Sequence, residues 1–185
     1  MEITIEKISK NTKKFFETAY KYSVMNENLE ELLGESFIKA PCTTTTGYYN
    51  AYEGGLIQHI LNTTKYAVSI NNLLPENKQV NIKSLIRVCL IHQIGKTNMF
   101  VEQESKWHRD NRGEMYKFNE DVLSMSVSER SIYYALKSGI DLTEDEVFAI
   151  YNYNSDFSHR PMTTEGENLA ALLKISNLTA IIEEK

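Results

Sequence analysis

Hydrophobic residues recur at intervals of three and four along most of the chain, which is the spacing of one face of an α-helix. The longest such run covers residues 55–74, with Leu56, Ile60 and Ala67 on one side. Pro75 follows directly, and proline cannot continue a helix because it lacks a backbone N–H. We therefore predict one long helix over this range.

The same spacing predicts helices on both sides of this run. Residues 3–24 indicate one or two amphipathic helices. Asn26 is a typical capping residue for a short helix that we expect to end at Gly34. Asn81 caps another predicted helix, which is apolar nearly all round in its second half, as a central helix would be. We expect Gly95 to end it.

Three later helices are indicated by one motif, a Ser or Thr followed three residues on by Glu and then by apolar residues at helical spacing. In such a capping box the two side chains satisfy free backbone N–H groups at the start of the helix. The motif occurs at residues 126–129, 143–146 and 164–167. These patterns predict an all-α protein. The chain has no repeat, linker or low-complexity segment, so we expect one domain over residues 1–185.

Two stretches lack helical spacing. Residues 40–53 hold one proline, four threonines and three tyrosines, and we predict an ordered loop whose tyrosines either line a pocket or pack on the core. Residues 99–101 and 115–118 are short apolar and aromatic runs that could pair as a small β-hairpin, with residues 107–110 in the loop between them.

Composition narrows the class of protein. The 185 residues are 42% hydrophobic and 24% charged, with a net charge of −5, which argues against duplex nucleic acid or an anionic membrane as the main partner. No apolar run approaches the roughly 18 residues of a membrane span. The first residues do not resemble a signal peptide, and Cys42 and Cys89 form no disulfide or metal motif. We expect a soluble, cytoplasmic protein.

The four histidines are the first candidates for chemistry. His59 and His92 stand in glycine-marked contexts on two long predicted helices, and facing helices are where bundles build metal and ligand sites. His108 follows the only tryptophan, Trp107, which leaves a role in a pocket open. His159 lies in a polar stretch and is expected to face water.

Two short strings carry a resemblance to a known family. The chain reads GGLIQH at residues 54–59 and HQIGK at residues 92–96. Together they resemble the signature of the HD-domain superfamily of metal-dependent phosphohydrolases, in which the strings read roughly GGLxxH and HDxGK. The resemblance extends over residues 50–182, and within the family this stretch is similar to a small, often phage-borne branch. It implies an HD-like helical core preceded by N-terminal helices in residues 1–39, and activity on nucleotides or nucleic acids.

The chain departs from the family pattern at its acids. The resemblance places remnant metal-ligand positions at His59 and His92. The aspartate that follows the second histidine corresponds to Gln93, and the late aspartate corresponds to Asn177. Further histidines or acids of the family correspond to residues 127 and 153, which are Val and Tyr here.

These replacements remove the charge that holds a divalent cation. Carboxylate oxygens bind such cations strongly, whereas the amides of Gln93 and Asn177 offer only neutral carbonyl oxygens. Without a firmly bound metal the site cannot lower the pKa of a water molecule. We therefore predict a catalytically impaired protein with no cofactor, and weak divalent metal binding at best.

A pocket that loses its acids and keeps its basic residues can bind a phosphate directly through charge-assisted hydrogen bonds. We expect His59, Lys96 and Arg109 to contact the phosphate of a nucleotide-like anion, and Gln93 and Asn177 to hold the pocket or read polar edges. Aromatic side chains could stack on a base. The full predicted set is His59, His92, Gln93, Lys96, Trp107, His108, Arg109, Arg130 and Asn177.

Other interpretations remain open at this point. The chain could be a metal-dependent nucleotide phosphohydrolase with an atypical site, or use His92 or His108 as a general base without a metal. It could also be a structural or protein-interaction module whose former pocket is filled. Eleven tyrosines are compatible with an interface, so a homo-oligomer is open as well.

Overall fold

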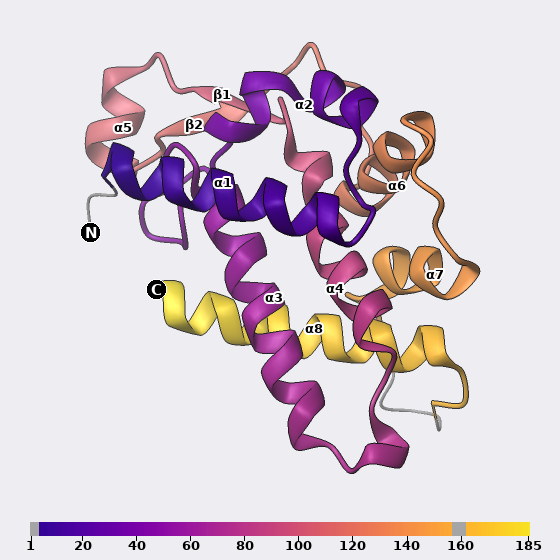
Figure 1. The fold of residues 1–185 in the computed structure, drawn as a ribbon. Coiled ribbons are helices and arrows are strands. Elements are labelled where there is room, and N and C mark those ends of the chain that lie inside the picture. Colours follow the sequence, from indigo (N-terminus) through magenta and orange to yellow (C-terminus); the bar gives the residue numbers. More distant parts are fainter. Residues whose placement is uncertain (1–3, 157–161) are drawn as a thin grey trace.

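The computed structural model describes residues 4–156 and 162–185, and His159 lies outside the described residues. The described part is mostly helical with one small antiparallel sheet, as the sequence predicts (Figure 1). Its elements are α1 (Ile5–Lys21), α2 (Glu27–Lys39), α3 (Gly55–Leu73), η1 (Glu76–Lys78), α4 (Ile82–Ile91), η2 (Ile94–Lys96), β1 (Phe100–Glu102), α5 (Lys106–Arg112), β2 (Tyr116–Phe118), α6 (Val127–Lys137), α7 (Glu144–Asn152) and α8 (Glu165–Glu184).

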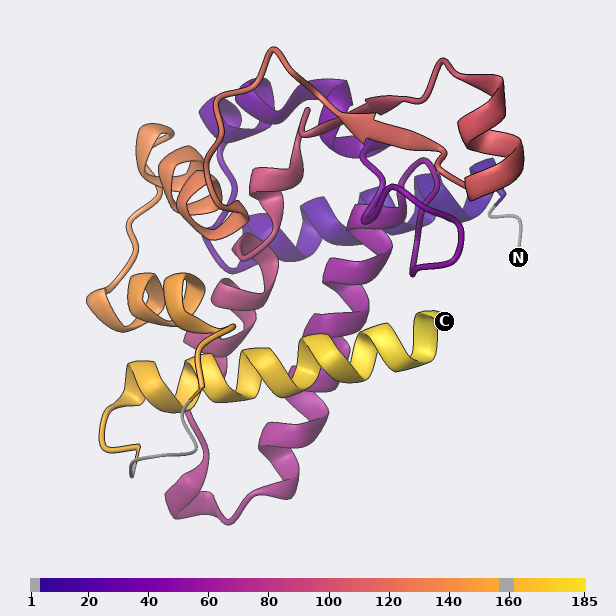
Figure 2. The same ribbon diagram turned by 180° about the vertical axis from the view of Figure 1, so that it is seen from behind.

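Helix α8 organises the packing. It crosses α3 in both views (Figures 1 and 2) and also packs against α4 and α7. Helix α1 packs on α3 and α4, and the rings of Phe15 and Phe37, 4.9 Å apart between centroids, tie α1 to α2. The α5 helix and the hairpin lie near the start of α1, whereas α6 and α7 lie on the other side of the molecule. Buried apolar side chains from α1, α2, α3, α4, α7 and α8 form one core.

Most predicted helix starts are confirmed. Asn26 accepts a hydrogen bond from the Leu29 backbone N–H, and all three capping boxes are formed, with both the side-chain and the backbone bond present. Gly34 interrupts α2 with a positive φ of 55°, but a further helical turn continues to Lys39. The predicted end at Gly34 is therefore a kink instead. The predicted long helix over 55–74 matches α3.

The predicted end of the central helix is wrong. Helix α4 stops at Ile91, and Gly95 lies inside the following η2 turn and does not cap α4. A Cβ added at Gly95 would lie 2.4 Å from the backbone oxygen of Val127 and 2.7 Å from the backbone nitrogen of Ser131. Glycine is needed here because η2 presses against α6, not because the chain turns left-handed.

The hairpin is confirmed, with Phe100 opposite Phe118 and Glu102 opposite Tyr116. The segment between the strands is not a plain loop, because residues 106–112 form α5, capped by Ser105. Residues 40–53 contain no helix or strand, as predicted, and an isolated bridge from Thr45 to Glu114 joins them to the hairpin segment.

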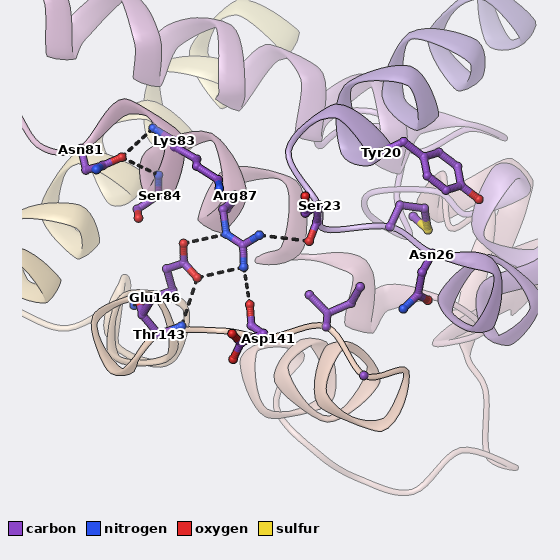
Figure 3. A pocket seen from close by; sticks show the side chains of 13 residues that line it. Tyr20, Ser23, Asn26, Asn81, Lys83, Ser84, Arg87, Asp141, Thr143 and Glu146 are labelled. Carbon is purple, nitrogen blue, oxygen red and sulfur yellow. Dashed lines mark hydrogen bonds and ion pairs between the residues drawn. The ribbon is translucent and has the colours of Figure 1, made fainter.

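One buried ion pair fixes α4 to its neighbours. Arg87 donates from Nε to Glu146 of α7 at 2.7 Å and from Nη1 to the backbone oxygens of Tyr22 and Ser23, between α1 and α2 (Figure 3). Its Nη2 donates to the Asp141 backbone oxygen and to Glu146. No helix of the described residues has the length and apolar character needed to cross a bilayer.

Candidate functional site

Helices α3 and α4 bring His59 and His92 together in the interior. Both side chains are fully buried, and their ring centroids lie 6.4 Å apart. His92 is the C-cap residue of α4, so Gln93 follows it directly at the point where α4 gives way to η2. Helix α8 crosses both helices and contributes Asn177 and Glu184. We call these five residues the His59 cluster.

The two amides of the cluster bind each other. Asn177 Oδ1 accepts from Gln93 Nε2 at 3.0 Å and from His59 Nε2 at 2.8 Å. Gln93 Oε1 accepts in turn from the Cys42 thiol, with a sulfur–oxygen distance of 3.6 Å. Gln93 is 2% exposed and Asn177 is 8% exposed, so these contacts are made away from water. The side chains of His59, Gln93 and Asn177 thus bind one another in the interior.

Glu184 is the member that the sequence interpretation missed. Its Oε2 accepts from His59 Nδ1 at 2.7 Å, its Oε1 accepts from Asn62 Nδ2 at 2.8 Å, and its side chain is 4% exposed. The signal was present, because Glu184 follows Asn177 by seven residues, which places it two helical turns further along the same face. An acid near the end of the chain was easily taken for a solvated one.

Both ring nitrogens of His59 have an oxygen of α8 at hydrogen-bond distance, Glu184 Oε2 beside Nδ1 and Asn177 Oδ1 beside Nε2. A buried carboxylate is tolerated only when it is paired and hydrogen-bonded, and His59 and Asn62 bind Glu184 in this way. His59 is therefore tied to α8 through both of its ring nitrogens.

His92 is held in its neutral form. Its Nδ1 donates to the Cys89 carbonyl oxygen at 2.7 Å, while its Nε2 is buried without a well-formed hydrogen bond. Burial, followed by the repulsion of His59, lowers the pKa of His92 to about 3, and the Cys89 carbonyl and Asn177 oppose this only weakly. His92 is thus neutral. Tyr153, one of the positions singled out by the family comparison, packs edge-on against it at 5.4 Å.

The 40–53 loop covers the cluster. Tyr49 packs against His59 with ring centroids 4.9 Å apart, and Lys96 Nζ donates to the Cys42 carbonyl oxygen at 2.7 Å. Burial raises the pKa of the Cys42 thiol to about 11, so it stays protonated. Of the loop tyrosines, Tyr49 packs inward, whereas Tyr48 is 62% exposed. Lys96 remains half-buried at the edge of the cluster.

The donors of the cluster do not fit a divalent cation. Within residues 4–156 and 162–185, no group of three or more His, Cys, Asp and Glu side chains could hold a metal ion. Both nitrogens of His59 are engaged, and the only carboxylate of the cluster, Glu184, is bound by His59 and Asn62. His92 Nε2 is the one ring nitrogen of the cluster left over, and a single imidazole does not hold such an ion firmly.

The predicted residues of α5 lie apart from the cluster. Trp107 is 56% exposed and stacks with Arg112, His108 donates to Glu114 at 2.7 Å, and Arg109 donates to the Gln103 carbonyl oxygen. These contacts all stay within residues 103–114. Arg130, on α6, is 7% exposed and binds the Tyr134 hydroxyl, also outside the cluster. The structure therefore gathers His59, His92, Gln93, Lys96 and Asn177, and leaves out the other four.

Part of the chain is similar in sequence to a known protein. Over 99 residues, 52% of this chain, it is 32% identical to dihydroneopterin 2′,3′-cyclic phosphate phosphodiesterase from Methanocaldococcus jannaschii. The match covers 37% of that protein, so the chain corresponds to well under half of its relative. No protein-family profile matches the chain, and no solved structure does. The chain is a distant homologue of a cyclic phosphate phosphodiesterase over about half of its length.

Proposed function

We propose that this chain is a catalytically impaired protein of the HD phosphohydrolase type, which keeps the helical frame and has lost the metal. One observation carries this proposal: Asn177 Oδ1 accepts hydrogen bonds from both His59 and Gln93, at the positions where the family resemblance expects metal ligands. The distant homology to a phosphodiesterase supports the ancestry.

The chemistry of the cluster explains the impairment. Phosphoester hydrolysis by such proteins needs a cation that lowers the pKa of a bound water and stabilises charge on the phosphate. Here Glu184 and Asn177 bind the two ring nitrogens of His59, and Glu184 is also bound by Asn62. Neither His59 nor Glu184 is left free to hold a cation that could bind a water or a phosphate.

A ligand role, if retained, falls to Lys96. The Lys96 side chain is half-buried, and its ammonium donates to the Cys42 carbonyl oxygen and to the Cys42 thiol. Among the described residues it forms no ion pair with a carboxylate. Tyr49 lies beside it, with its ring 6.0 Å from Nζ. A nucleotide-like phosphate bound or sequestered at this edge would meet a cation and an aromatic face without displacing His59.

A second candidate function is favoured by the burial of the cluster. Since His59 and His92 are fully buried beneath Tyr49, the chain could also act as a protein-interaction module whose former pocket serves only as core. The two proposals differ in whether any nucleotide binds.

The loss of hydrolysis is tested with purified chain assayed on nucleoside 2′,3′-cyclic phosphates and on dihydroneopterin 2′,3′-cyclic phosphate, with Mn²⁺ or Mg²⁺ added. We expect no turnover above that of the His59→Ala, His92→Ala double variant, which serves as the background control. Metal-dependent turnover that the double variant abolishes would contradict the proposal.

The ligand role is tested by thermal unfolding with mono-, di- and cyclic nucleotides. A ligand present at 100 times its dissociation constant adds about 2.7 kcal/mol to the free energy of unfolding, which is readily measured. We expect the stabilisation to be lost in Lys96→Ala and kept in Lys13→Ala, whose side chain is 77% exposed. No stabilisation by any nucleotide would favour the interaction module.

A further inference from the structure

Two arginines are buried within residues 4–156 and 162–185, and their hydrogen bonding differs. All five N–H groups of Arg87 have acceptors, supplied by Glu146 and by the backbone carbonyl oxygens of Tyr22, Ser23 and Asp141. Figure 3 shows the bonds to Glu146, Ser23 and Asp141. The cavity beside it, about 590 Å³, is therefore lined by a guanidinium that has no bonding capacity left for a ligand. Arg87 is a structural residue.

Arg130 is not satisfied in this way. Its Nε and Nη2 both donate to the Tyr134 hydroxyl, at 2.8 and 2.5 Å, and its guanidinium lies over the Tyr134 ring. Its Nη1 is buried and has no hydrogen-bond partner among the described residues. A buried donor without an acceptor is destabilising, the more so when it is charged, and native proteins seldom leave such a group without a reason.

Arg130 lines a separate cavity of about 650 Å³, a volume typical of small-molecule sites. Most of its wall is apolar or aromatic, and the segment between β2 and α6 supplies Leu123, which is 77% exposed. No member of the His59 cluster lines this cavity. The apolar lining residues are Val122, Leu123, Met125, Tyr133 and Tyr134.

We propose that this cavity binds a small organic carboxylate with an apolar body, the carboxylate on Arg130 and the body against Leu123 and Met125. A monoanion fits the charges better than a phosphate does, because Arg130 is the one cation among the described residues of the wall and Asp121 adds a negative charge to it. The site is independent of the proposed function at the His59 cluster.

Binding requires a small rearrangement. Arg130 Nη1 is shielded from solvent, so the guanidinium turns toward the cavity, or the Tyr134 ring shifts, before a carboxylate reaches it. The free energy of this step is offset because Nη1 gains the acceptor that it lacks. A charge-assisted hydrogen bond in a poorly solvated wall is stronger than the same bond at the surface.

The test is titration calorimetry with octanoate, its neutral counterpart octanamide, inorganic phosphate and AMP. We expect octanoate to bind at least about tenfold more tightly than octanamide. The variant Arg130→Met keeps most of the side-chain packing and should abolish that difference. Leu123→Ser removes an apolar side chain of the cavity wall that is 77% exposed, and should weaken the binding of both ligands. The control Arg112→Met, on α5, should change neither.

Equal binding of octanoate and octanamide would overturn the proposal, and so would the absence of octanoate binding up to about 10 mM, or AMP or phosphate binding more tightly than octanoate in an Arg130-dependent manner. Circular dichroism of Arg130→Met shows whether it folds. If it does not, Leu123→Ser and the comparison of octanoate with octanamide decide the question.

Discussion

At the scale of single residues, the His59 cluster is held together by its own hydrogen bonds. Glu184 and Asn177 bind the two ring nitrogens of His59, while His92, 6.4 Å away, is neutral because burial and the nearby His59 lower its pKa to about 3. The ring of His92 binds the Cys89 carbonyl oxygen and packs edge-on against Tyr153. The amides of Gln93 and Asn177 bind each other without adding charge.

Two neighbouring acids at the end of α8 test the buried contact between His59 and Glu184. Glu184→Gln removes the buried carboxylate that His59 and Asn62 bind, and should lower the free energy of unfolding by about 2–4 kcal/mol. Glu183→Gln is the matched control, because Glu183 pairs with Lys65 at the exposed surface and should cost less than about 1 kcal/mol. Both values come from urea unfolding at neutral pH. Equal effects of the two variants would mean that the His59–Glu184 pair is not formed.

His92 predicts a pH dependence with a definite sign. Its pKa is about 3 in the folded chain and near 6.5 when unfolded, so below pH 6.5 the unfolded state binds the proton and the folded state does not. The contribution of His92 is fully present above pH 6.5 and is lost as the pH falls toward 3. As the pH falls from 6.5 to about 4, the loss in the free energy of unfolding from His92 amounts to about 3 kcal/mol. Urea unfolding at several pH values should show that the free energy of unfolding of His92→Gln falls less steeply with decreasing pH than that of the unaltered chain. The same slope for both chains would contradict the low pKa of His92.

At the scale of elements, the sequence predicted the starts of helices better than their ends. The capping boxes are local, because the side chain and the N–H that it binds lie within four residues. The end of α4 depends on α6, since Gly95 is required by contact with the Val127 and Ser131 backbone. That contact joins residues more than 30 positions apart, and no local pattern contains it.

Substitution of two glycines tests the close contact between η2 and α6. Gly95→Ala places a Cβ 2.4 Å from the Val127 oxygen, and we expect it to lower the free energy of unfolding by about 2 kcal/mol or more. Gly47→Ala, in the 40–53 loop, meets nothing within 4 Å and should change stability by less than about 0.5 kcal/mol. Thermal unfolding of both variants gives the comparison. A Gly95→Ala chain as stable as Gly47→Ala would show that η2 does not press on α6.

At the scale of the whole molecule, long-range packing decides which of the predicted residues lie together. The resemblance to the HD-domain superfamily singled out His59, His92, Gln93 and Asn177, and the crossing of α3, the end of α4 and α8 brings these four together. The residues of α5 entered the predicted site through their chemistry alone, and the fold places α5 beside the hairpin instead. Glu184 was missed because its burial depends on α8 crossing α3, which its own neighbours in sequence do not reveal.

We propose that the hydrogen-bond network of the His59 cluster takes the place of a metal-binding centre. Calorimetric titration of the purified chain with Mn²⁺ at neutral pH tests this most directly, after a chelator has been used and removed. We expect no stoichiometric binding, and a gain of binding in the Gln93→Asp, Asn177→Asp variant, which adds two carboxylates to the cluster. One or two Mn²⁺ ions bound by the unaltered chain with a dissociation constant on the order of 1 μM would contradict it.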